Sequence, residues 1–140
     1  MTILIDTDIL LDAALDRAPH ADAAVALLNL LHAKPGMGYV AWHTLSNFYY
    51  LTRPQRGHKD SKLFIGELLQ FVAVTPTGTK DALYALDLPF SDFEDALQSA
   101  SAIACRARWI VTRNTRHYLK SPVPAITPAR FLQLKVVDDG

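Results

Sequence analysis

The stretch Thr2-Ile3-Leu4-Ile5-Asp6-Thr7-Asp8 decides the fold of this chain. Residues 2–5 form an apolar run with no polar alternation, which is typical of a strand buried on both faces of a parallel sheet. Asp6 ends that run. Because ligands bind outside the carboxyl ends of the strands in an open parallel sheet, Asp6 and Asp8 stand where a functional site is expected.

The composition fits one globular domain over residues 1–140. Half of the 140 residues are hydrophobic and 20% are charged, which is usual for a soluble domain. The single cysteine, Cys105, has no partner for an internal disulfide, and we expect a buried structural thiol. No apolar run reaches the roughly 20 residues of a membrane helix, and Met1 leads directly into a strand without a signal-peptide pattern. We therefore expect a cytoplasmic protein with no membrane segment.

Strands and helices are predicted to alternate along the chain. Further strands are expected at residues 39–42, 71–74, 109–112 and 125–127. Helices are expected at 20–33, 43–52, 60–70, 79–85, 91–106 and 128–134, with Pro54 ending the second of them. This alternation predicts an α/β fold, with a short central parallel sheet of four or five strands flanked by helices on both faces.

The charge is unevenly distributed although the net charge is zero. Residues 96–135 hold seven basic side chains and no acidic one: Arg106, Arg108, Arg113, Arg116, Lys120, Arg130 and Lys135. A second basic run is formed by Arg53, Arg56, Lys59 and Lys62. Either set can bind nucleic-acid phosphates or form an ordinary solvated surface.

Polar side chains gather after the predicted strands and at one helix start. Carboxylates that meet at one edge of a sheet repel each other unless a proton or cation lies between them. Hard oxygen ligands of this kind suit Mg²⁺ or Mn²⁺. The residues concerned are Asp6, Thr7, Asp8, His43, Thr44, Ser46, Asn47, Asp92, Glu94, Asp95, Thr112, Arg113 and Asn114.

Several of these side chains also have a purely structural interpretation. Ser91 and Glu94 have the spacing of a capping box, which we favour over metal binding for Glu94. Asp92 can simply complement the helix dipole, and Asp12 is expected to face solvent. Asp95 lies a turn inside a helix that must pack, where a carboxylate needs a functional reason. The aromatic residues Trp42, Tyr49 and Trp109 are expected to pack in the core.

Four sequence pieces, in this order, resemble the PIN-domain family, and specifically VapC-like toxins. They are Ile5-Asp6-Thr7-Asp8-Ile9-Leu10-Leu11-Asp12, Thr44-Leu45-Ser46-Asn47-Phe48-Tyr49-Tyr50-Leu51, Asp92-Phe93-Glu94-Asp95-Ala96-Leu97-Gln98 and Ile110-Val111-Thr112-Arg113-Asn114. The resemblance continues through Pro124-Ala125-Ile126-Thr127-Pro128 and covers nearly the whole chain.

The resemblance implies a metal-dependent endoribonuclease in which acidic residues hold Mg²⁺, or Mn²⁺ as a substitute. Asp6 and Asp95 match the two most characteristic acids of the family, as catalytic residues and metal ligands. Asn114 is a third catalytic candidate, since it stands where many members carry another Asp, and Asn47 or Ser46 stands where an acid is common in the helix after the second strand. Supporting or substrate-binding roles fall to Asp8, Asn47, Asp92, Glu94, Thr112 and Arg113. RNA, a small antitoxin and a second copy of the chain are the implied partners.

Two alternatives stay open at this stage. The Asn residues at positions 47 and 114 are compatible with a PIN-like scaffold that binds RNA or protein without cleaving it. Asp6-Thr7-Asp8 also satisfies the opening D-x-D pattern of haloacid-dehalogenase-like phosphatases, in which the first Asp is a nucleophile. Neither a strand-terminal Lys nor a later pair of acids supports that second alternative.

Overall fold

A five-stranded, fully parallel sheet forms the centre of the computed structural model, which describes residues 1–139. The strands follow the spatial order β3-β2-β1-β4-β5. Their bounds are β1 Ile3–Ile5, β2 Gly38–Val40, β3 Val72–Val74, β4 Trp109–Val111 and β5 Ala125–Ile126. The predicted α/β class and parallel sheet are confirmed. Because the chain order reverses beside β1, this strand and β4 form the switch point at which ligands bind in such sheets.

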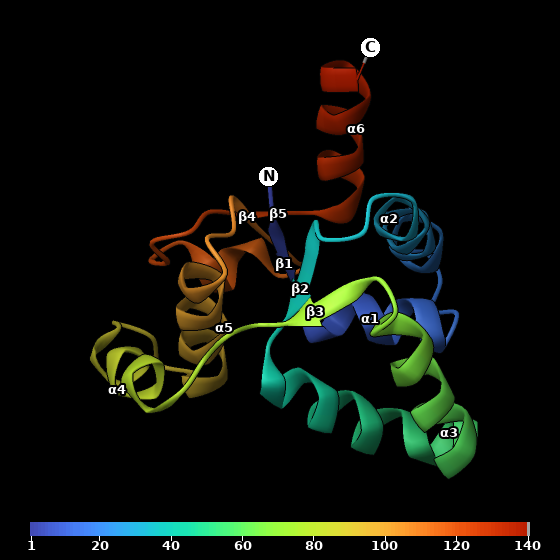
Figure 1. Cartoon of the computed structure of the whole chain (residues 1–140), viewed down its shortest axis with the longest axis horizontal. Helices are drawn as coiled ribbons and strands as arrows, with labels where there is room; N and C mark the ends of the chain where they lie inside the picture. The colour runs from blue at the N-terminus through green and yellow to red at the C-terminus, as the bar shows by residue number, and fades with distance from the viewer. Residues whose placement is uncertain (140) are drawn as a thin grey trace.

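Helices cover both faces of this sheet (Figure 1). Helices α1, α2 and α3 lie on one side, while α4 and α5 lie together on the other; α6 projects from the end of the sheet beside α2. Their bounds are α1 Thr7–Ala14, α2 Ala21–Ala33, α3 Trp42–Leu68, α4 Thr79–Asp87, α5 Phe93–Ala104 and α6 Pro128–Asp139. None of the helices within residues 1–139 combines the length and apolarity that crossing a membrane requires.

The core follows from the alternation of side chains along β1. Ile3 and Ile5 face the cluster that includes Leu27 and Phe48, contributed by α2 and α3. Leu4, between them, faces the opposite cluster, which contains Ile110 and Tyr118. The sheet is therefore buried on both faces, which explains why residues 2–5 show no polar alternation.

The boundaries differ from the sequence prediction at two places. Residues 7–14 form α1, a helix that the prediction lacked, and Asp6 is its N-cap. The helices expected at 43–52 and 60–70 form one element, α3, bent at Gly57, where φ is 84° and ψ is 164°. Pro54 lies inside α3 and does not end it. The break falls at Gly57 because a residue without Cβ adopts that backbone conformation at low cost.

Candidate active site

A cavity of about 400 Å³ opens at the carboxyl ends of β1 and β4. It lies where the loops after these strands meet the start of α5 and the second turn of α3. Its lining residues are Asp6, Thr7, Asp8, Leu11, Asn47, Tyr50, Leu51, Glu94, Asp95, Asn114 and His117. Four carboxylates therefore share one cavity, as the sequence predicted for the edge of a parallel sheet. We call it the acidic cavity.

Asp6 is the most firmly held of these carboxylates. One oxygen, Oδ1, accepts hydrogen bonds from the Thr7 backbone N–H at 2.8 Å and from Gln98 Nε2 at 3.0 Å. The other, Oδ2, accepts from the Thr112 hydroxyl at 2.8 Å and from the Tyr118 hydroxyl at 3.1 Å. Two donors on each oxygen hold this carboxylate in one orientation. Asp6 is thereby a buried side chain with a fixed position beside the cavity.

Asp8 is held on one side only. Its Oδ2 accepts from the Arg113 backbone N–H at 3.0 Å, from Asn114 Nδ2 at 3.2 Å and from the Thr112 hydroxyl at 3.3 Å. Its Oδ1 is buried and has no hydrogen-bond partner among the described residues. Burial, reinforced by the negative charge of Asp6, raises the pKa of Asp8 to about 7. This oxygen is thus available to a proton or a cation.

Glu94 faces the acidic cavity and does not form the predicted capping box. Asp92 is the N-cap of α5, and its carboxylate accepts from the Glu94 backbone N–H at 2.8 Å. The Glu94 side chain instead accepts from Asn47 Nδ2 at 3.1 Å. Partial burial, followed by the charges of Asp6 and Asp92, raises the pKa of Glu94. The capping-box interpretation is wrong because the helix begins one residue later, at Phe93.

Asp95 reaches the cavity from the first turn of α5. Its Oδ2 lies 3.6 Å from His117 Nδ1, in the short 3-10 helix Thr115–Tyr118. Burial and the nearby Asp92 raise the pKa of Asp95, while the charge of His117 acts in the opposite direction. Because α5 begins at Phe93, Asp95 lies in its first turn and not a full turn inside it as predicted, and it lines the same cavity as Asp6.

Arg113 points away from the cavity and pairs with Asp12. Its Nε lies 2.6 Å from Asp12 Oδ2, and its terminal nitrogen donates to Oδ1 at 3.2 Å. Arg17 donates to the same carboxylate at 3.1 Å. Asp12 is 0% exposed, so its interpretation as a solvent-facing residue is wrong. The contribution of Arg113 to the cavity is its backbone N–H, which binds Asp8.

The structure brings most of the sequence-predicted site residues together. Asp6, Asp8, Asn47, Glu94, Asp95 and Asn114 line the acidic cavity. Thr112 lies behind it and donates to Asp6, whereas Asp92 lines a neighbouring groove. Trp42, expected in the core, is 73% exposed.

Sequence reasoning assigned no role to Gln98, Tyr118 or His117, which complete the site. Gln98 is buried and donates to both Asp6 and the Thr44 hydroxyl. Its position three residues after Asp95, on the same face of a helix, is a signal that could have identified it. Tyr118 and His117 carry no comparable signal, because a short irregular segment brings them to the cavity.

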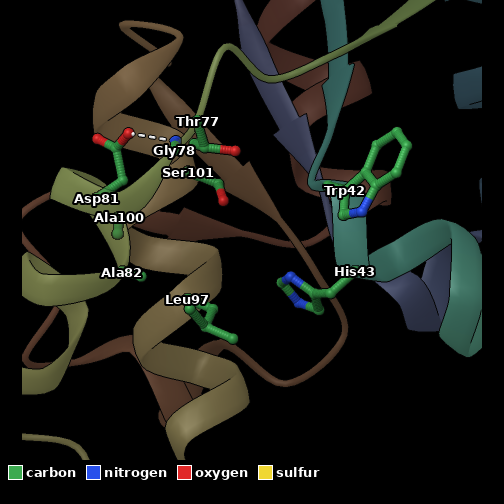
Figure 2. Close-up of a pocket in the computed structure, with 9 residues that line it drawn as sticks. All are labelled: Trp42, His43, Thr77, Gly78, Asp81, Ala82, Leu97, Ala100 and Ser101. Atoms are coloured by element: carbon green, nitrogen blue, oxygen red, sulfur yellow. Dashed lines mark hydrogen bonds between the residues drawn. The ribbon is translucent and has the colours of Figure 1, made fainter.

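A second cavity, of about 260 Å³, lies between the start of α3 and the pair α4 and α5. Figure 2 shows His43 facing Leu97 and Ser101 across it. Gly78 and Asp81 lie at the far wall, joined by a hydrogen bond of 2.9 Å. Burial lowers the pKa of His43. The wall is mainly apolar and does not include the carboxylates of the acidic cavity.

The acidic cavity fits a hard divalent cation. Within residues 1–139 no three His, Cys, Asp or Glu side chains stand together as a ready-made metal cage. Mg²⁺ does not need one, because it usually keeps several waters and binds one or two carboxylates. The buried, unpartnered Oδ1 of Asp8 and the raised pKa values of Asp8, Glu94 and Asp95 are the features expected where a cation normally balances charge.

A comparison with protein families identifies the chain. The PIN domain model matches residues 2–116. The chain belongs to the PIN-domain family. The family resemblance predicted from the sequence is thus confirmed. Among curated proteins, none matches the sequence significantly.

Solved structures of similar fold are toxins and toxin–antitoxin complexes. VapBC2 of Rickettsia felis, bound to a DNA fragment from its promoter, matches with a TM-score of 0.70 at 18% identity, covering 91% of this chain and 98% of that chain. A toxin–antitoxin complex of Klebsiella pneumoniae matches with a TM-score of 0.67 at 20% identity, covering 91% and 98%. The sarcin-ricin loop cleaving toxin VapC20 of Mycobacterium tuberculosis gives 0.61 at 17%, covering 78% and 87%. At these identities the likeness establishes the fold.

Proposed function

We propose that this PIN domain is a Mg²⁺-dependent endoribonuclease, with Mn²⁺ as a substitute, and the toxin of a toxin–antitoxin pair. The observation that carries the proposal is the convergence of Asp6, Asp8, Glu94 and Asp95 on one cavity at the switch point of the sheet. Similarity to VapC20, described as a sarcin-ricin loop cleaving toxin, supports RNA as the substrate class.

Asp6 and Asp95 are the residues that would hold the ion, and the free Oδ1 of Asp8 would add an oxygen to them. Such an ion activates water and neutralises charge on a phosphodiester. The chain's own contribution is positioning. Four donors fix Asp6, and Asn114 holds Asp8 by a hydrogen bond of 3.2 Å. Carboxylates held in this way lose little conformational entropy when a cation or substrate binds.

A groove next to the acidic cavity offers a path for the RNA backbone. This groove, of about 780 Å³, shares Asp95 and His117 with the cavity, and its lining also includes Asp92 and two cationic side chains, Arg116 and Lys120. Phosphate binding by such cations releases counterions, and we expect RNA affinity to fall steeply with salt. Arg116 and Lys120 therefore take the phosphate-binding role, because Arg113 is committed to Asp12.

A small antitoxin and a second copy of the chain are the proposed protein partners. Complexes that contain an antitoxin are among the structures of similar fold. Exposed apolar side chains on α3 and α4, including Leu63, Leu83 and Leu86, offer surface for protein contacts.

A non-catalytic PIN scaffold is the second candidate. The specific observation in its favour is that Asn47 and Asn114 supply amide groups where the family resemblance implies acids. Membership of the PIN-domain family removes the basis of the phosphatase alternative, which rested on Asp6-Thr7-Asp8 alone.

Cleavage of mixed cellular RNA, with Mg²⁺, with Mn²⁺ and with EDTA, tests the proposal. Asp6→Asn and Asp95→Asn are each expected to lower cleavage by at least about 100-fold, because even residues that only support a metal ligand are worth 10–100-fold. The matched control is Asp16→Asn, the same substitution at an exposed position. RNA binding without cleavage under any metal, unchanged by EDTA, would instead support the scaffold.

A further inference from the structure

An exposed group of aromatic and basic side chains lies on α3 at the rim of the acidic cavity. Tyr50 lines this cavity and is nevertheless 61% exposed. The next residue, Leu51, also lines the cavity and is 56% exposed. Arg53 follows one helical turn after Tyr50 and is exposed. This part of α3 therefore presents its larger side chains to solvent directly beside the carboxylates.

Contacts along α3 hold the two tyrosine rings in place. The Tyr49 and Tyr50 rings meet edge to face, with centroids 5.0 Å apart and an interplanar angle of 83°. The Tyr49 hydroxyl is 2.6 Å from His58 Nδ1, and this contact spans the bend at Gly57. Tyr50 is thus held by its contact with Tyr49, which is itself held by His58 on the far side of the bend.

Arg53 adds a cation to the same group. Its guanidinium carbon lies 5.6 Å from the centre of the Tyr50 ring and 6.0 Å from that of Tyr49, within the usual range of cation–π contacts. Arg56, in contrast, donates to the Ala14 carbonyl at 2.8 Å and lies over Phe64. Of these two arginines, Arg53 is the one placed beside the cavity.

We propose that Tyr50 and Arg53 form a stacking site for an unpaired base of the RNA strand next to the scissile phosphate. This inference rests on the proposed ribonuclease function and specifies part of its substrate site. Single-stranded nucleic acids are bound by aromatic side chains on which bases stack, beside cations that attract the backbone. Tyr50 supplies the ring, and Arg53 supplies the charge and a second planar surface.

The charges around the cavity favour nucleic acid as the occupant of this site. Asp6, Asp8, Glu94 and Asp95 repel phosphates, so an RNA strand needs cations on both sides of them to remain bound. On one side stands the groove with Arg116 and Lys120. On the other, Arg53 is followed along α3 by the exposed Lys59 and Lys62. Because Tyr50 lines the acidic cavity, we expect a strand that crosses it between these cationic side chains to contact Tyr50.

Binding of a fluorescent single-stranded RNA of about ten nucleotides tests the site. The full chain carries Asp95→Asn to prevent cleavage, and anisotropy reports the dissociation constant. Tyr50→Ala is expected to weaken binding about tenfold, whereas Tyr50→Phe, which keeps the ring, stays within about twofold of the parent. The matched control is Tyr84→Ala, which removes an exposed tyrosine from α4, on the other side of the sheet.

A second set of RNAs, each lacking one base, identifies stacking directly. At one position, loss of the base is expected to weaken parent binding and to abolish the effect of Tyr50→Ala, because the two changes remove the same contact. In the cleaving protein, Tyr50→Ala should raise KM more than it lowers kcat, since the base contact is remote from the reacting phosphate.

The outcomes separate this inference from the proposed function. RNA cleavage by the wild type, together with parent-like binding by Tyr50→Ala, overturns the stacking site and leaves the ribonuclease intact. Equal losses with Tyr50→Ala and Tyr50→Phe also overturn it, because the ring is then not what binds. Tyr50-dependent binding without cleavage supports the site and overturns the ribonuclease. No RNA binding by the Asp95→Asn protein overturns the stacking site, and if the wild type also fails to cleave RNA, the ribonuclease is overturned as well.

Discussion

Asp8→Asn is expected to stabilise the metal-free protein at neutral and alkaline pH while it lowers RNA cleavage. The cause is the buried carboxylate of Asp8, whose Oδ1 has no hydrogen-bond partner among the described residues. An Asn side chain keeps one acceptor oxygen for Thr112, Arg113 N–H and Asn114, the three donors that Asp8 now uses. It removes the negative charge next to Asp6.

The magnitude follows from the pKa of Asp8, which burial raises from 3.8 to about 7. Between about pH 4 and pH 7 the folded state holds a proton that the unfolded state has released. Wild-type stability therefore falls as pH rises through this window, by about 1.4 kcal/mol per pH unit at most. The loss accumulates to about 4 kcal/mol as an upper limit and is complete above pH 7 to 8. The Asp8→Asn variant has no carboxyl group at this position and therefore does not undergo this pH-dependent loss of stability.

Urea unfolding in EDTA at pH 5 and pH 8 measures the effect. For an m-value near 2 kcal/mol/M, we expect the midpoint of Asp8→Asn to exceed that of the wild type by about 1–2 M more at pH 8 than at pH 5. Asp16→Asn, an exposed aspartate in the next segment, controls for the change in net charge. A midpoint difference between Asp8→Asn and wild type that is the same at both pH values would refute this reasoning.

Two substitutions and one labelling experiment test the packing of the folded chain. Asp12→Asn should lower the free energy of unfolding by about 2–4 kcal/mol, because it leaves the guanidinium of Arg113 without its buried counter-charge; an unchanged urea midpoint would contradict this. Gly57→Ala should cost about 1–3 kcal/mol, since φ is 84° there, whereas the control Gly66→Ala, within helical α3, should cost nothing. Cys105 is buried with its pKa raised to about 11, so intact-mass analysis at pH 8 should show iodoacetamide labelling only in urea; rapid native labelling would refute its burial.

The sheet and two of the cavity acids, Asp6 and Asp95, could be predicted because local patterns encode them, whereas Glu94 was favoured as a capping residue and lines the cavity instead. A run of apolar residues ending in Asp6 identifies a buried strand and its carboxyl end, and a parallel sheet brings such ends together. Asp95 was identified because a carboxylate is unfavourable on a helix that packs against the core unless it serves a function. Both inferences depend on one element at a time, so no knowledge of tertiary contacts was required.

The hydrogen-bond partners of those acids could not be predicted in the same way. Tyr118 lies 112 positions from Asp6 and Arg113 lies 101 positions from Asp12. No local pattern selects one donor over another at such a separation. Helix α1 was not predicted because its buried apolar residues Ile9, Leu10 and Leu11 are consecutive and are not themselves spaced three or four positions apart.

The two asparagines of the cavity change how its negative charge is balanced. Asn47 donates to Glu94 and Asn114 donates to Asp8, and both carboxylates have raised pKa values. Acids at positions 47 and 114, as the family resemblance implies, would each add a charge and remove a donor from the same small volume. With Asn there, two repulsive contacts become hydrogen bonds. The folded state of this PIN domain should therefore depend less on a bound cation than that of a variant carrying Asn47→Asp and Asn114→Asp.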